Sequence, residues 1–172
     1  MNVKTLLRFS IVPLLAVVVF AADQVTKYLV STGLSIGQAW MPIDWLVPFL
    51  VVRHVRNSGA AFGIFPAAGP IFLGIAVIVV IGIVVYYYSR IHTAPMWVRF
   101  SIGLMLGGAI GNMIDRVRFG FVVDFIDLGW FPVFNVADSC IVVGVTMLAI
   151  YMAFIQPRPV QPSKASLDQT TS

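Results

Sequence analysis

Two aspartates in apolar surroundings are the residues of this sequence best suited to chemistry. Asp124 lies within the run Phe-Val-Val-Asp-Phe-Ile, and Asp138 follows Phe-Asn-Val-Ala further along the chain. If the two carboxyl groups meet in a pocket of low dielectric constant, they cannot both ionise, so they share a proton and titrate as a unit. One carboxylate can then take a proton from water while the other donates to a carbonyl oxygen. The pair therefore indicates aspartic-protease chemistry.

A purely structural interpretation is open for one of these aspartates. Asn135 can cap a helix, because its side-chain oxygen can accept a hydrogen bond from a first-turn backbone N–H group. Asp138 would then lie in the first turn, where a negative charge interacts favourably with the helix dipole. This interpretation leaves Asp124 unexplained, because an acid within an apolar run needs a partner.

Polar residues in two other apolar stretches are expected to support the pair. Asp23 and Lys27 are four residues apart and share one face of a helix. Asn112 and Arg116 have the same spacing, with Asp115 one turn from Asn112. An interfacial ion pair is an alternative for Lys27, and a helix end emerging into water explains Arg116. Neither alternative explains Asp23 or Asn112, so we expect these groups to face the interior of a helical bundle.

Small residues accompany these polar groups. Asn57-Ser-Gly-Ala-Ala-Phe-Gly precedes the second apolar stretch, where Asn57 can hydrogen-bond a substrate or the aspartates, or belong to a simple turn. The third stretch carries Gly103, Gly107 and Gly111 at four-residue spacing, with Gly108 beside Gly107. This spacing lets helices approach closely in lipid. We expect a packing face here, with Gly111 also keeping the floor of the site clear.

Other chemistries fit the sequence less well. All seven acidic residues are aspartates, and the single cysteine, Cys140, excludes an internal disulfide and a cysteine-based zinc site. Ser58, Ser101 and Ser139 have no nearby histidine or lysine in an activating arrangement. Clustered aspartates can bind calcium or magnesium, but Lys27 and Arg116 already supply positive charge. We therefore expect no metal and no cofactor. The basic residues are scattered, which argues against a nucleic-acid partner.

The elements that must position these residues are membrane spans. The chain is 59% hydrophobic and 10% charged, and a spanning helix needs about 20 apolar residues. Four stretches qualify, and a cleavable signal peptide is the alternative for the first. The prediction is one membrane-embedded domain over residues 1–156, with spans at about 9–30, 70–88, 96–114 and 135–155, a β-containing extracytoplasmic cap at about 31–69, and a disordered cytosolic tail at 157–172.

The acidic residues predict where the chemistry takes place. With four crossings both termini share one side of the membrane, and every aspartate except Asp168 falls on the other side. The cationic residues divide almost evenly, which is a weak signal for orientation. We place the termini in the cytosol and the chemistry near the outer face.

Five motifs in order resemble the lipoprotein signal peptidase family, the type II signal peptidases. They are Asp23-Gln-x-x-Lys27, Asn57-x-Gly-Ala-Ala-Phe-Gly63, Gly107-Gly-x-x-Gly-Asn-x-x-Asp-Arg116, Val122-Val-Asp-Phe125 and Phe134-Asn-x-Ala-Asp138. The resemblance implies an aspartic endopeptidase of the bacterial inner membrane with Asp124 and Asp138 as its catalytic pair. It implies that the substrate-binding or site-supporting residues are Asp23, Lys27, Asn57, Gly108, Asn112, Asp115, Arg116 and Asn135.

The resemblance also implies the substrate, a prolipoprotein that carries a diacylglyceryl group on a cysteine and is cut just before that cysteine. Sensitivity to globomycin and independence of metals are implied as well, and we expect a monomer surrounded by membrane lipid. Two other classes remain as alternatives. A proton-coupled transporter would spread ionisable residues through the depth of its spans, whereas an assembly factor would use the aspartates only as structural ion pairs.

Overall fold

Four long helices and a small sheet make up the computed structural model, which describes residues 3–41, 49–59, 69–90 and 93–155. The helices are α1 (Val3–Gly33), α2 (Gly69–Arg90), α3 (Met96–Phe119) and α4 (Val136–Ile150), and a π-helical turn, η4 (Tyr151–Ile155), continues α4. Each is long and apolar enough to cross a membrane, η4 completing the fourth span. The predicted fold class, four membrane-spanning helices with a small β-containing cap, is confirmed.

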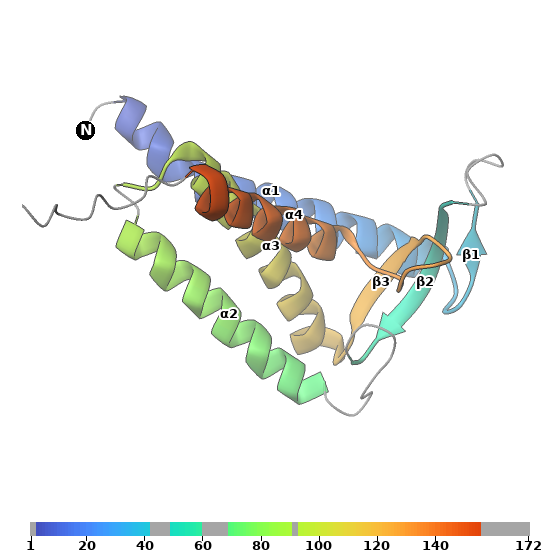
Figure 1. The fold of residues 1–172 in the computed structure, drawn as a ribbon. Coiled ribbons are helices and arrows are strands. Elements are labelled where there is room, and N and C mark those ends of the chain that lie inside the picture. Colours follow the sequence, from blue (N-terminus) through green and yellow to red (C-terminus); the bar gives the residue numbers. More distant parts are fainter. Residues whose placement is uncertain (1–2, 42–48, 60–68, 91–92, 156–172) are drawn as a thin grey trace, which may run out of the picture.

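The sheet lies at the end of the bundle that is opposite the start of α1 and the end of α4 (Figure 1). Its three antiparallel strands have the order β1 (Ala39–Trp40), β2 (Val51–Asn57) and β3 (Val122–Asp127). Asp124 on β3 pairs with Val55 on β2, and an irregularity in β2 between Val52 and Val55 shifts the register. Parts of the predicted cap and the whole of the predicted tail lie outside the described residues.

Two helices run further than the apolar stretches suggest. α1 continues to Gly33, and α3 continues through Asp115 and Arg116 to Phe119. Gly120 ends α3 in the left-handed conformation, with φ of 78°, and its N–H donates to the carbonyl oxygen of Arg116. A residue without a side chain adopts this conformation at little cost. The extension places polar residues of α3 beside the sheet.

α3 is the central helix, and it packs against the other three. Glycines allow this close approach, as the spacing predicts. A Cβ atom on Gly107 would lie 2.6 Å from the carbonyl oxygen of Ala16 on α1, and one on Gly108 would lie 2.5 Å from that of Ala137 on α4. Both distances are too short for a real side chain. α1 and α4 therefore meet α3 backbone to backbone, which fixes the depth at which their polar residues lie.

Replacing Gly107 with alanine is expected to destabilise the protein by about 1–3 kcal/mol, because overpacking forces the helices apart. Gly74 on α2 offers a matched control, since a Cβ atom there meets no atom within 4 Å. Alanine at Gly74 should be neutral or stabilising, because it lowers the backbone entropy lost on folding. Thermal unfolding in detergent micelles measures both variants. Equal changes in the two would contradict the packing role of Gly107.

Candidate active site

Asp124 is a buried carboxylate held by two amide groups. It is 1% exposed, although it belongs to a strand of the small sheet at the end of the bundle. Asn57 on β2 donates from Nδ2 to its Oδ2 at 2.8 Å, and Asn135 donates from Nδ2 to its Oδ1 at 2.6 Å. The backbone N–H of Gly59 donates to Oδ1 of Asn57, which holds that amide in place. The Asn57 side chain therefore takes part in a turn and binds Asp124 at the same time.

Asp138 lies in the first turn of α4, where the structure shows a complete capping box. The Asn135 side chain accepts from the backbone N–H of Asp138 at 2.9 Å, and Asp138 Oδ2 accepts from the backbone N–H of Asn135 at 3.3 Å. Its other oxygen, Oδ1, accepts from Nδ2 of Asn112 at 2.7 Å. Asn135 and Asp138 therefore do cap α4, as the structural interpretation predicts. Capping does not explain why Asp138 also accepts a hydrogen bond from Asn112 on α3.

Asn135 joins the two aspartates. Its side-chain amide donates to Asp124, and its backbone N–H donates to Asp138. It is fully buried, and its amide also donates to Oδ1 of Asn112 at 3.1 Å. One residue thus fixes the separation of two carboxylates that come from a strand and from a helix.

Lys27 is the buried positive centre below this pair. It is 3% exposed, and its Nζ lies 2.8 Å from Asp23 Oδ2, 2.9 Å from Asp115 Oδ2 and 2.9 Å from Asn112 Oδ1. An ammonium group has three protons, so each has an acceptor. Lys27 and Asp23 therefore form an ion pair buried inside the protein and not one exposed on its surface.

Asp23 and Asp115 tie the three elements around Lys27 together. Asp23 Oδ1 accepts from the backbone N–H of Ala137 on α4 at 3.0 Å, and Asp115 Oδ2 accepts from that of Val123 on β3 at 3.2 Å. Both are buried. Each carboxylate therefore uses one contact for Lys27 and another for an element that carries a member of the aspartate pair.

Gln24 is a site residue that the sequence interpretation missed. Its amide donates to Asp115 Oδ1 at 3.1 Å and to Asp23 Oδ2 at 3.2 Å, which links α1 to α3. It stands inside the first motif, next to Asp23, and a polar amide within an apolar span was the available signal. Because Gln24 lies between the charged residues Asp23 and Lys27, its uncharged side chain is the weaker signal in this motif.

The remaining predicted residues divide into two groups. Arg116 is half-buried, donates to the carbonyl oxygen of Asn112 at 3.4 Å and interacts electrostatically with Asp138, Asp124 and Asp115. Gly108 touches none of these carboxylates and serves the contact between α3 and α4. Gly111 does border the site, because a Cβ atom there would lie 2.5 Å from Asp23 Oδ2.

Burial raises the pKa of Asp124 from 3.8 to about 7, and the negative charge of Asp138 acts in the same direction. Hydrogen bonds from Asn57 and Asn135 and the charge of Lys27 oppose this rise. Near neutral pH Asp124 can therefore hold a proton while a neighbouring carboxylate is ionised. Asp127, at the other end of β3, behaves in the opposite way. Its pKa is lowered by the hydrogen bond from Arg53, whose Nε lies 2.7 Å from Asp127 Oδ2.

Comparison with known proteins assigns the family. The sequence model described as signal peptidase (SPase) II matches residues 15–154. The lipoprotein signal peptidase of Moorella thermoacetica is 44% identical over 135 residues, which cover 78% of this chain and 87% of that protein. That of Syntrophotalea carbinolica is 44% identical over 153 residues, covering 84% and 92%.

A solved structure described as a bacterial membrane enzyme has the same fold. It is 37% identical to this chain, covers 86% of it and 93% of its own chain, and superposes with a TM-score of 0.72. The sequence match contains the buried aspartates, Lys27 and the three asparagines described above. This chain belongs to the signal peptidase II family of membrane aspartic peptidases.

Proposed function

We propose that this protein removes signal peptides from diacylglyceryl-modified prolipoproteins by cutting just before the lipidated cysteine, in the membrane of a bacterial cell. The arrangement of Asn135, which donates to both Asp124 and Asp138, carries this proposal. An aspartic peptidase needs two carboxylates at a fixed separation that share one proton. Asn135 provides that separation without neutralising either group.

In this proposal Asp124 carries the proton and Asp138 is ionised. Asp124 has a raised pKa. Asp138 lies in the first turn of α4, where the helix dipole favours a negative charge. Asp138 takes a proton from the attacking water, and Asp124 donates its own to the carbonyl oxygen of the scissile bond. Arg116, close to both, is placed to bind the substrate backbone or to stabilise developing negative charge.

The location of the pair supports a lipid-anchored substrate. Asp124 lies on β3 and Asp138 in the first turn of α4, at the end of the bundle opposite the start of α1 and the end of α4 (Figure 1). We propose that the termini face the cytosol and that this end faces outward. The diacylglyceryl group anchors the modified cysteine in the membrane, so the bilayer brings the scissile bond to the depth of the aspartates.

Purified protein supplied with a diacylglyceryl-modified precursor tests the proposal. We expect a single cut just before the lipidated cysteine, located by mass spectrometry, and inhibition by globomycin. The same precursor without the lipid is the matched control and should be cut far more slowly. Equal cleavage of both precursors would show that the enzyme does not require the lipid. A cut at another position would show that the assigned scissile bond is wrong.

The dependence of cleavage on pH follows from the raised pKa of Asp124. A raised pKa means that the protonated form persists up to about 7 and is lost above it. We therefore expect kcat/KM to fall about tenfold per pH unit once the pH exceeds this value. Initial rates measured in micelles of a non-ionic detergent give the profile. An ordinary aspartate would lose its proton near 3.8, so constant activity from neutral to alkaline pH would contradict the assignment.

A further inference from the structure

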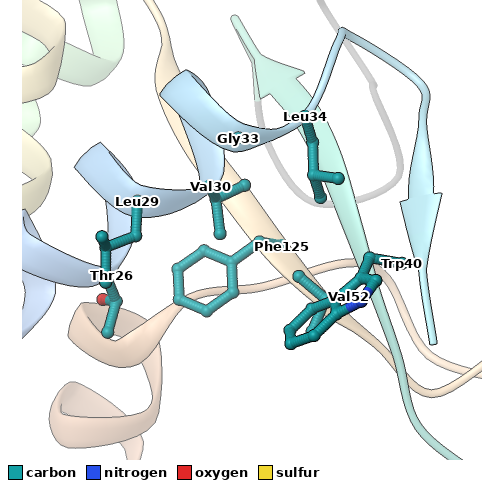
Figure 2. Close-up of a pocket in the computed structure, with 8 residues that line it drawn as sticks. All are labelled: Thr26, Leu29, Val30, Gly33, Leu34, Trp40, Val52 and Phe125. Atoms are coloured by element: carbon teal, nitrogen blue, oxygen red, sulfur yellow. The ribbon is translucent and has the colours of Figure 1, made fainter. Parts of the chain in front are cut away.

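A cavity of about 430 Å³ lies behind β3, between that strand and the outer end of α1 (Figure 2). Leu29, Val30 and Leu34 line it from the α1 side, and Trp40 and Phe125 line it from the sheet. Figure 2 shows the Phe125 ring in the middle of this space, facing α1. The cavity is large enough for a small ligand.

The walls of this cavity are mostly apolar. Thr26 is the lining residue with a side-chain hydroxyl, and that hydroxyl donates within α1, to the carbonyl oxygens of Ala22 at 2.8 Å and Asp23 at 2.9 Å. The proton of this hydroxyl is therefore already used in hydrogen bonds within α1. The mostly apolar lining therefore favours a hydrocarbon chain as the ligand.

The α1 wall of the cavity belongs to a membrane span. Its α1 residues from Thr26 to Gly33 belong to the last turns of the span Ser10–Gly33. At that depth Val25 is 57% exposed and Leu29 is 60% exposed. Apolar side chains exposed on a spanning helix are covered by lipid. Leu29 thus belongs both to the cavity wall and to an apolar surface that lipid covers.

The strand itself separates this cavity from the aspartate pair. Successive side chains of a strand point to opposite faces. Asp124 contacts Asn57 and Asn135 on one face of β3, and Phe125 enters the cavity on the other. A lipid attached to the residue being cut would have to pass around the strand. The bilayer reaches the cavity directly.

We propose that an acyl chain of a phospholipid from the surrounding bilayer occupies this cavity and packs against Phe125. The occupant supports the strand that carries Asp124 from behind, so the lipid becomes part of the structure that holds the carboxylate. This proposal rests on the membrane location of the helices and does not depend on the reaction assigned to the aspartates.

Tryptophan quenching by brominated phospholipid tests the occupant. Trp40 lines the cavity, and the other three of the chain's four tryptophans can be replaced by phenylalanine. Vesicles contain equal parts phosphatidylcholine and phosphatidylglycerol, brominated on the upper part of the acyl chains. We expect stronger quenching of Trp40, which is 56% exposed, than of Trp97, which is 44% exposed and lies outside the cavity, in the corresponding variant that retains only Trp97.

Gly33 provides a way to fill the cavity. It lines the space, and a Cβ atom there meets no atom within 4 Å. Gly33→Leu should displace the lipid and reduce quenching of Trp40 to the Trp97 level, whereas Gly33→Ala should preserve the excess. Gly74→Leu, on α2 and equally unobstructed, should leave quenching unchanged.

Two results would overturn the proposal. One is equal quenching of Trp40 in Gly33→Leu and Gly33→Ala, which would mean that no chain enters the cavity. The other is loss of quenching when a diacylglyceryl-modified peptide is added, which would assign the cavity to the lipid of the substrate. Because neither measurement needs peptide cleavage, both results can be told apart from failure of the proposed reaction.

Discussion

Asparagine in place of Asp124 or Asp138 is expected to reduce kcat by at least about 10³-fold, because either change removes one partner of the proton exchange. The fold should survive. Asparagine has the size of aspartate, and its side-chain oxygen can still accept from one of the amides that surround each carboxylate. At Asp124 the substitution replaces a group that burial already drives towards its neutral form. Cleavage of the lipidated precursor and thermal unfolding measure the two effects separately.

Asp127 provides the matched control on the same strand. Its carboxylate pairs with Arg53 and accepts from the backbone N–H of Gly129, away from Asp138. The Arg53 side chain is 43% exposed, and such pairs contribute about 0–1 kcal/mol. Asp127→Asn should therefore retain nearly full activity. Comparable losses at Asp124 and Asp127 would indicate that the strand, and not the aspartate pair, is what the substitutions disturb.

The sequence predicted the components of this site better than their connections. Asp124 stood out because an acid in an apolar run is costly, and Lys27 because it shares a helix face with Asp23. These signals come from residue type and local spacing. They also favoured a peptidase over a transporter or an assembly factor, and the family match shows that the enzyme interpretation is correct.

The connections depend on tertiary packing, which local spacing does not encode. Nothing in the sequence indicates that Asp115 accepts from Val123, or that Asp23 accepts from Ala137. These contacts require α1, α3 and α4 to meet at one depth, which the glycines of α3 fix. Gln24 was missed for the same reason, because its role appears only when α3 lies against α1.

Replacing Lys27 with methionine is expected to destabilise the protein by about 3–5 kcal/mol, because it leaves the buried carboxylates of Asp23 and Asp115 without their cation. For a chain of this size, each kcal/mol lowers the unfolding temperature by about 2–4 °C. Activity should fall as well. Lys27 and Asn135 both donate to Oδ1 of Asn112, so they turn the amide of Asn112 to donate to Asp138.

A second substitution separates these two roles. Lys27→Met with Asp115→Asn removes one negative charge together with the positive one. Only the carboxylate of Asp23 is then buried without its cation, instead of two carboxylates. We expect this double variant to recover much of the unfolding temperature lost in Lys27→Met. Its kcat should stay about 10²-fold low, because the Asn112 amide has lost one of the two donors that orient it. Small displacements at a reacting centre have effects of this size. Recovery of kcat in parallel with stability would show that Lys27 only balances charge, and that Asp138 needs no help from it to stay in position.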